Sequence, residues 1–269
     1  MSFLSDFGLD DEFVGVVHAV CDRVAPGVTV IDVTHGVPAH DVRAGALTLW
    51  RAVPWLVPGV VLGVVDPGVG TARRAVALTV AAAGATLVGP DNGLLIPAAH
   101  RLGPITEAVE IVPDAGLGPP GDWGATFAGR DVFAPAAARA ALGVALDRIG
   151  TAVDPASLAG EPVPRPTRSG DVVHAEVLWV DRFGNAQLNA TAADLPAPPA
   201  AEVLVEVGSR SWVGRLVGSY GDIAPDPVAV VVDSYGHLSI CCDRRSAAAT
   251  YGLAVGQPVR LSRSERHPR

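Results

Sequence analysis

The stretch Val60-Val61-Leu62-Gly63-Val64-Val65-Asp66-Pro67-Gly68-Val69-Gly70-Thr71-Ala72-Arg73-Arg74 decides the fold of this chain. Its apolar run is typical of a buried strand, and the Pro-Gly turn ends that strand. We therefore expect Asp66 at the carboxyl end of an interior strand, where open α/β sheets place their ligand crevice. Arg73 follows closely enough to fold back over Asp66, although a structural turn with an ion pair fits this spacing as well.

Three other apolar segments also end in an aspartate, at Asp6, Asp32 and Asp91. If the four strands are parallel neighbours, several carboxylates converge at one edge of the sheet. Aspartates in turns also serve as caps, so not all four need be functional. A carboxylate at such a strand end can accept both hydroxyl hydrogens of a sugar cis-diol.

Periodicity predicts the elements around these aspartates. Helical spacing extends from about Asp11 to Val24, with acidic residues in the first turn, and from His40 to Val53. A further helix opens at Thr126–Pro135 and reaches about Leu142. Strands are expected at Ser2–Ser5 and Val28–Ile31, and a hairpin at Ala75–Val80 with Thr86–Val88.

The composition describes a globular protein of one large or two smaller domains, with 269 residues, 49% hydrophobic and 18% charged. The net charge of −8 argues against non-specific binding to nucleic acid or to an anionic membrane. Three cysteines, two of them adjacent, give no disulfide framework. No apolar run reaches the ~20 residues of a membrane span. We expect a soluble cytoplasmic protein without a metal-ligand cluster.

The predicted secondary structure changes after a proline-rich segment, which we interpret as a linker over residues 157–170. Residues 1–156 are predicted to form an α/β domain with a central, mostly parallel sheet. Residues 171–269 are predicted to form an all-β barrel, because they contain short β-type runs between turns. These runs are Val172–Val180, Glu202–Val207, Val228–Val232 and Leu238–Cys241. The Pro/Gly-rich segment 113–122 is expected to be a surface excursion or a subunit contact.

Two local features leave alternatives open. Gly68-Val69-Gly70-Thr71 lacks the lysine and the spacing of a phosphate loop, so nucleotide-phosphate binding there is disfavoured. Aromatic side chains near turns can either stack on a flat ring or simply pack. These aromatic residues are Trp50, Phe183, Tyr220 and Tyr235.

Six motifs, in this order, make the chain resemble the S-adenosyl-L-methionine (SAM) hydroxide adenosyltransferases. These adenosine-forming SAM hydrolases are relatives of the SAM-dependent fluorinases and chlorinases. The motifs are Ser5-Asp6-Phe7-Gly8, Val65-Asp66-Pro67-Gly68-Val69-Gly70-Thr71, Gly89-Pro90-Asp91-Asn92-Gly93-Leu94-Leu95, Phe127-x-Gly129-Arg130-Asp131-x-Phe133-Ala134-Pro135, Phe183-Gly184-Asn185 and Ser234-Tyr235-Gly236.

The resemblance implies an α/β domain followed by a barrel, assembled as a homotrimer. SAM would lie between the N-terminal domain of one subunit and the C-terminal domain of the next. Water or hydroxide would attack C5′ and expel methionine, leaving adenosine. SAM is then the substrate, and the resemblance implies no metal and no separate cofactor.

The resemblance also implies roles for individual residues. Asp66 and Arg73 match two members of an Asp-Arg-His set that orients water, and tyrosine replaces this aspartate in the halogenating relatives. Because a buried carboxylate repels a halide, Asp66 favours water as the nucleophile. Asp6 would hold the ribose hydroxyls, with Asp11 as a second acidic position nearby. Further substrate contacts would come from Trp50, Phe127, Phe183, Asn185, Tyr220, Ser234, Tyr235, Cys242 and Arg244.

One position departs from the family pattern, because Ala128 stands where the motif has histidine. Alanine cannot orient or deprotonate water, and losing such a group costs on the order of 10²–10⁴ in rate. The alanine is either a deliberate replacement that traps a substrate complex or a natural divergence with weak activity. Two other functions stay open: a non-catalytic SAM- or adenosine-binding protein and, disfavoured by Asp66, a SAM-dependent halogenase.

Overall fold

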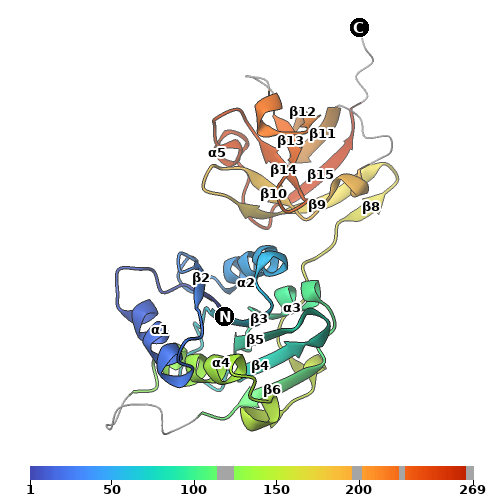
Figure 1. Cartoon of the computed structure of the whole chain (residues 1–269). Helices are drawn as coiled ribbons and strands as arrows, with labels where there is room; N and C mark the ends of the chain where they lie inside the picture. Colours follow the sequence, from blue (N-terminus) through green and yellow to red (C-terminus); the bar gives the residue numbers. More distant parts are fainter. Residues whose placement is uncertain (114–123, 196–201, 224–227, 265–269) are drawn as a thin grey trace. The chain divides into compact units, whose positions relative to one another are not determined.

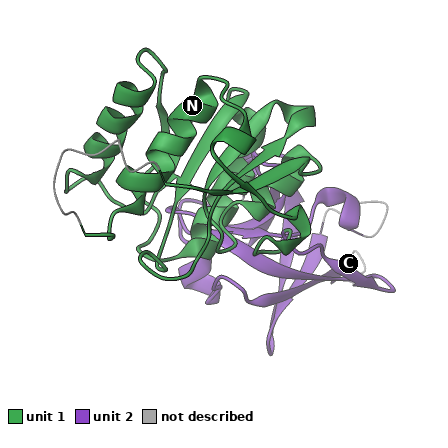
Figure 2. Cartoon of the chain, turned by 90° about the horizontal axis from the view of Figure 1, so that it is seen from below, with its two compact units in different colours: residues 1–162 green, residues 163–269 purple. Residues whose placement is uncertain are grey.

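The computed structural model of this protein describes residues 1–113, 124–195, 202–223 and 228–264. The predicted excursion at 113–122 therefore lies almost wholly outside the described residues. The chain divides into two compact units, Met1–Pro162 and Val163–Arg269, which are considered separately below (Figures 1 and 2). The division falls inside the predicted linker. Among the described helices, none is long and apolar enough to cross a bilayer.

Unit 1 is built around a seven-stranded sheet with a parallel half and an antiparallel half. The four parallel strands are, in spatial order, β2 (Ile31–Thr34), β1 (Ser2–Ser5), β3 (Gly59–Val64) and β5 (Ala85–Pro90). The antiparallel strands that continue the sheet are β4 (Ala75–Val80), β6 (Glu107–Ile111) and β7 (Gly150–Ala152).

Helices cover both faces of this sheet, so the apolar strand β3 is buried on each side. Leu62 and Val64 belong to the core that includes helices α1 (Phe13–Val24) and α4 (Ala134–Ala141). Gly63 faces the other way, where a Cβ would lie 3.1 Å from Leu49 of α2 (Val42–Ala52). Helix α3 (Ile96–Leu102) packs against α2 (Figure 1). Close packing on both faces explains why β3 reads as a continuous apolar run.

Two predicted boundaries in unit 1 are wrong. The second strand begins at Ile31 and not at Val28, because the backbone pairs with β1 only from Ile31, which lies opposite Ser2. Asp32 therefore lies within β2 instead of following it. Helix α1 starts at Phe13, so Asp11 precedes the helix and no acidic residue lies in its first turn. The hairpin of β4 and β5 is confirmed.

Unit 2 is a closed barrel of seven strands. The strands follow one another around the barrel, β9 and β10 pair to close it, and β8 (Thr167–Ser169) extends the sheet beyond β9. In spatial order they are β10 (Ala186–Leu188), β14 (Leu238–Cys241), β13 (Ala229–Val232), β12 (Arg210–Val217), β11 (Glu202–Val207), β15 (Pro258–Arg263) and β9 (Val172–Val180). The predicted fold class, an α/β unit followed by a β-barrel, is confirmed.

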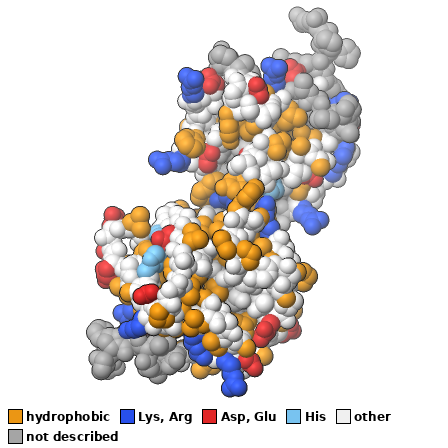
Figure 3. Space-filling view, in the orientation of Figure 1, with side chains coloured by type: hydrophobic (Ala, Val, Ile, Leu, Met, Phe, Trp, Pro, Cys, Tyr) orange, Lys and Arg blue, Asp and Glu red, His pale blue; other side chains and the backbone are white. Residues whose placement is uncertain are grey.

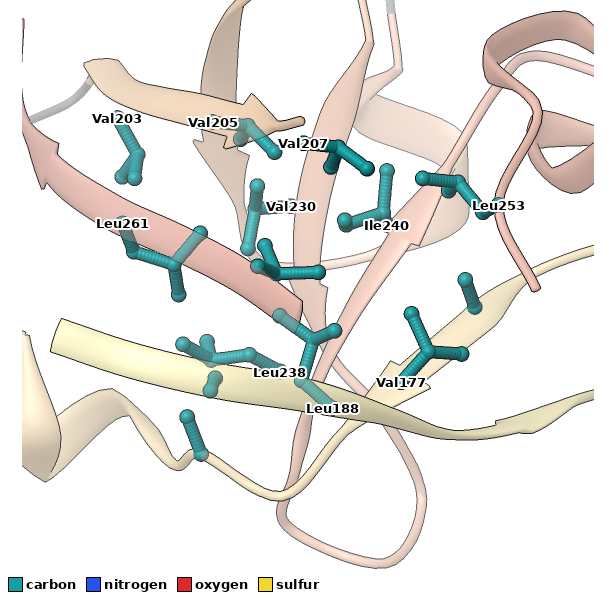
Figure 4. Close-up of a cluster of buried hydrophobic side chains, with 14 of the residues drawn as sticks. Val177, Leu188, Val203, Val205, Val207, Val230, Leu238, Ile240, Leu253 and Leu261 are labelled. Carbon is teal, nitrogen blue, oxygen red and sulfur yellow. The ribbon is translucent and has the colours of Figure 1, made fainter. Parts of the chain in front are cut away.

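Apolar side chains fill the interior of the barrel. Val177, Leu188, Val205, Leu238 and Leu261 point inward and are fully buried (Figure 4). A barrel of this size is filled by its own side chains. Any ligand of unit 2 must therefore bind on the loops and the outer surface.

Candidate active site

The parallel half of the sheet brings carboxylates to one edge. Asp6 follows β1, Asp66 follows β3 by two residues, and Asp91 follows β5 directly. These three strands are adjacent and parallel, so their carboxyl ends meet at the same edge. The sequence-based expectation of converging carboxylates is met for these three strands, at the edge where α/β sheets bind ligands.

Asp66 and Arg73 form a bidentate ion pair across the Pro-Gly turn. The Arg73 Nε donates to Asp66 Oδ1 at 2.9 Å, and Arg73 Nη2 donates to Oδ2. Only 6% of the Asp66 side chain and 12% of the Arg73 side chain are exposed. The Arg73 guanidinium also lies 5.1 Å above the ring centre of Phe133. A two-point contact of this kind holds both side chains in one orientation.

Burial controls the acidity of this pair. Removal from water raises the pKa of the Asp66 carboxyl above its ordinary value, more than the Arg73 charge and hydrogen bonds lower it. The Asp6 carboxylate adds to the rise by like-charge repulsion. The two carboxylates thus lie within electrostatic range of each other, and a raised pKa makes Asp66 a stronger base than an exposed aspartate.

Asp6 is held by backbone and keeps one oxygen available. Its Oδ2 accepts a hydrogen bond from the His40 N–H at 2.8 Å. His40 has a φ of 67°, an unusual conformation for a residue other than glycine. Within the described residues, no hydrogen-bond donor reaches the other oxygen of Asp6. That oxygen is suited to accept from a ligand hydroxyl.

The other two strand aspartates have structural partners. Asp91 accepts from Arg74 Nε at 2.8 Å and from the Ala159 N–H at 2.7 Å, so it ties the sheet edge to the end of unit 1. Asp32 contacts two histidines, His18 and His35. Asp6 and Asp66 therefore remain as the candidates for a reaction at this edge of the sheet.

Ala128 lies in the segment that borders the Asp66–Arg73 turn. It immediately precedes a π-helix, Gly129–Phe133, an irregularity that is frequent at functional sites. Two contacts join this segment to the turn. A Cβ on Gly70 of the turn would lie 3.5 Å from the Ala125 carbonyl oxygen, and the Arg73 guanidinium lies over the Phe133 ring. The side chain of Ala128 is half-buried against the unit 1 core.

Three phenylalanine rings cover this segment. The centres of the Phe7, Phe13 and Phe127 rings lie 5.0–5.8 Å apart in tilted and edge-to-face pairs. Gly129 lies beneath them, where a Cβ would lie 3.0 Å from Phe7 and 3.1 Å from Phe127, so a larger residue there would require these rings to shift. Phe127, a predicted substrate contact, is thus part of an aromatic cluster.

Two other predicted contacts of unit 1, Asp11 and Trp50, lie on other elements. Asp11 is exposed in the bend before α1. Trp50 lies on α2, where the Arg101 guanidinium from α3 is 4.2 Å from the centre of its ring. Substrate binding by these two residues stays a prediction.

Unit 2 contains a surface cleft of about 650 Å³ that gathers five predicted contacts. Two aromatic side chains in it are well exposed, Phe183 by 73% and Tyr220 by 52%, so their faces are free to stack on a flat ring. The five are Phe183, Asn185, Tyr220, Cys242 and Arg244. The family resemblance named these residues from three separate loops, and the fold brings them together.

Asp181 also lines this cleft and was missed by the sequence analysis. Its Oδ1 accepts from the N–H groups of Phe183 and Asn185, both at 2.9 Å. Its Oδ2 accepts from the Asn185 side chain at 2.8 Å. Asp181 thus fixes the loop that presents Phe183 and Asn185.

A second loop repeats this design at Asp233–His237. Asp233 Oδ1 accepts from the N–H groups of Tyr235 and His237, at 2.8 and 3.1 Å. The repeated pattern, Asp-x-aromatic-Gly-x, was the available signal for Asp181. Ser234 and Tyr235 lie exposed on this second loop and are not among the residues that line the cleft.

The two loops are within electrostatic range of one side chain. Partial removal from water raises the pKa of the Tyr220 phenol, and the Cys241 thiol and the carboxylates Asp181 and Asp233 add to the rise. Tyr220 is therefore a neutral hydroxyl at physiological pH, able to donate or accept a hydrogen bond in the cleft.

Gly184 and Gly236 occupy equivalent positions in the Asp181 and Asp233 loops, so their replacement by alanine can be compared directly. Gly184 and Gly236 share a φ of 84°, but a Cβ on Gly184 would overlap Ser246 at 2.0 Å, whereas nothing lies within 4 Å at Gly236. Gly184→Ala is expected to lower the free energy of unfolding by about 2–4 kcal/mol, from backbone strain and overpacking together. Gly236→Ala should cost about 1–2 kcal/mol from strain alone. Denaturant unfolding measures both, and equal losses would contradict the Ser246 contact.

Comparison with known proteins defines the class to which this two-unit chain belongs. The SAM hydroxide adenosyltransferase N-terminal domain matches residues 1–150, and the corresponding C-terminal domain matches residues 175–260. The chain belongs to the SAM hydroxide adenosyltransferase family, which confirms the resemblance drawn from its motifs.

Particular relatives are similar over nearly the whole chain. The (R)-S-adenosyl-L-methionine hydrolase of Salinispora tropica is 47% identical over 97% of both chains, and that of Thermus thermophilus is 43% identical over 96% of this chain and 98% of its own. A fluorinase from an Actinoplanes species is 27% identical over 98% of this chain and 97% of its own. A crystal structure of an uncharacterised conserved protein from Thermotoga maritima matches with a TM-score of 0.88 and 32% identity, over 97% of this chain and 99% of that one.

Proposed function

We propose that this protein hydrolyses SAM to adenosine and L-methionine. The buried, bidentate Asp66–Arg73 pair at the sheet edge carries the proposal, because it is a preorganised acceptor for a water molecule. Family membership and the SAM hydrolases among the relatives support it.

The reaction is an in-line displacement at C5′ of SAM. The water oxygen forms the new bond to C5′ while the C5′–S bond breaks and its electron pair stays on sulfur, so methionine leaves as a neutral thioether. Asp66 orients the water and takes its proton. Burial raises the pKa of this carboxyl, which makes the carboxylate a better proton acceptor. Arg73 fixes Asp66. Such a reaction depends mainly on positioning the nucleophile and excluding competitors.

Two regions of the chain divide substrate recognition in this proposal. Asp6 accepts from the ribose hydroxyls with the oxygen that His40 leaves available. In the unit 2 cleft, Phe183 and Tyr220 stack on adenine, and Asn185 lies on the methionine side. The remaining contacts carried over from the family are Asp11, Trp50, Phe127, Ser234, Tyr235, Cys242 and Arg244.

The same resemblance supports a proposal for the oligomeric state, and the cysteines support one for the cellular location. We propose a homotrimer in which unit 1 of one subunit and unit 2 of the next share each SAM molecule, with no separate cofactor. Light scattering that gives the mass of a single chain would contradict this assembly. We assign the protein to the cytoplasm, which its free thiols Cys21, Cys241 and Cys242 support.

Product analysis tests the reaction. SAM incubated with the protein in ¹⁸O-labelled water, with and without chloride, is expected to give methionine and adenosine labelled at its 5′ oxygen. No 5′-chloro-5′-deoxyadenosine should form, because the Asp66 carboxylate repels a halide. Mass spectrometry distinguishes these products, and a chlorinated nucleoside would instead support a halogenase.

A second candidate, a non-catalytic SAM-binding protein, is favoured by one observation. Ala128 offers no donor or acceptor where the family motif has histidine. This candidate predicts SAM binding by calorimetry with no product at any enzyme concentration. Labelled adenosine that disappears in the Asp66→Asn variant would exclude it.

A further inference from the structure

Three side chains outside the proposed SAM site converge on one point between α1 and β2. His18 Nε2 lies 2.8 Å from Asp32 Oδ1, and His35 Nε2 lies 3.1 Å from the same oxygen. All three potential ligand atoms lie within 4.8 Å of one another. Histidine and acidic side chains are exposed together over this part of unit 1 (Figure 3).

His35 is the buried member of this cluster, with only 3% of its side chain exposed. Its Nδ1 lies 2.8 Å from Ser5 Oγ, and the Phe3 ring centre is 4.6 Å from its own. The contact to Asp32 lacks hydrogen-bond geometry, so Nε2 is buried without a hydrogen-bond partner among the described residues. Buried polar atoms in this state need an explanation, such as an ion.

The hydrogen bond between His35 and Ser5 indicates what kind of partner the His35 Nε2 atom needs. When Nδ1–H donates to Ser5 Oγ, the Nε2 lone pair faces the Asp32 carboxylate. Two acceptors 3.1 Å apart repel each other unless a cation lies between them. An imidazole whose second nitrogen is held by a hydroxyl is also the usual arrangement of a metal-ligating histidine.

We propose that His18 Nε2, Asp32 Oδ1 and His35 Nε2 bind a divalent transition-metal ion. Tetrahedral zinc, with bonds of about 2.0–2.1 Å, separates its ligand atoms by about 3.3 Å. The two contacts to Asp32, at 2.8 and 3.1 Å, are somewhat shorter than this separation. Two imidazoles and one carboxylate suit zinc, cobalt, nickel or copper, whereas magnesium and calcium prefer oxygen ligands.

The site is open on one side and has a structural role. The side chains of His18 and Asp32 are 36% and 39% exposed, which gives the ion a path from solvent and leaves a coordination position for water. The ligands come from α1, from β2 and from the turn after β2, so the ion ties the helix to the edge of the sheet.

Thermal unfolding of the full chain tests the site. After treatment with a chelator and its removal, Zn²⁺ or Co²⁺ at 100 times its Kd is expected to raise Tm by roughly 5–10 °C. Mg²⁺ at the same concentration should leave Tm unchanged. Bound Co²⁺ should also show ligand-field absorption without thiolate charge transfer, which separates this site from the three cysteines.

Two variants and a control locate the ion. Asp32→Asn and His18→Gln keep the size of each side chain and should each reduce the Tm shift by more than half. His100→Gln changes an exposed histidine on α3 and should keep the full shift. The proposal is overturned if the unchanged protein shows no shift, or if both cluster variants shift as much as the control.

Discussion

Replacing Ala128 by histidine is expected to raise kcat for adenosine release by about 10²–10⁴-fold. Position 128 immediately precedes the π-helix Gly129–Phe133. This segment borders the Asp66–Arg73 turn, because Ala125 lies close to Gly70 and the Phe133 ring lies against the Arg73 guanidinium. An imidazole there would share the water and its proton with Asp66. Single-turnover assays across pH measure the gain, which should fall as pH drops below about 6.5 because the imidazole becomes protonated.

Two controls separate chemistry from packing in this experiment. Ala128→Leu adds apolar volume to this half-buried position without a polar atom and should give no gain. Ala128→Gln can orient water but cannot take a proton, so it should recover only part of the gain, without the pH dependence. If all three variants release adenosine at the original rate, position 128 has no part in the reaction.

Much of the fold could be predicted because its determinants are local. The apolar runs at β1, β3, β9, β11 and β14 coincide with their predicted ranges, since turn residues bound each of them. Strand β12 was missed because Gly214 and two arginines interrupt its pattern. The two-residue turn Gly208-Ser209 between β11 and β12 was the available signal.

The candidate site was less accessible to sequence reasoning, because side-chain partners depend on tertiary contacts. In the sequence, Asp32 and Asp91 each follow an apolar segment as Asp66 does, yet Asp32 lies within β2 and contacts two histidines, and Asp91 contacts Arg74. The sequence predicts no metal-ligand cluster, because His18 and His35 lie 17 residues apart and show no ligand spacing. Their convergence on Asp32 depends on how α1 packs beside β2.

Arg73→Met is expected to lower kcat by about 10²–10³-fold and the free energy of unfolding by about 3–5 kcal/mol. Methionine can keep the packing on Phe133, but it leaves the Asp66 carboxylate buried without its partner. Removing one member of a buried ion pair costs this much because the remaining charge loses compensation. Denaturant unfolding and initial-rate assays at neutral pH measure the two losses.

The stability of Arg73→Met should depend strongly on pH. Burial already raises the pKa of Asp66, so the folded protein binds this proton more tightly than the unfolded chain. Stability therefore falls as pH rises from the ordinary carboxyl pKa through the raised value in the folded protein. Loss of Arg73 raises the folded pKa further, so the window widens and unfolding curves should show higher stability at acidic pH than at neutral pH.

The double variant Asp66→Asn/Arg73→Met separates the structural from the catalytic role of the pair. Asparagine carries no charge to leave uncompensated, so most of the stability lost in Arg73→Met should return. Turnover should stay at the level of the Arg73→Met variant, because the amide at position 66 does not take a proton from water. A double variant that is stable and fully active would show that Asp66 and Arg73 only close the turn after β3.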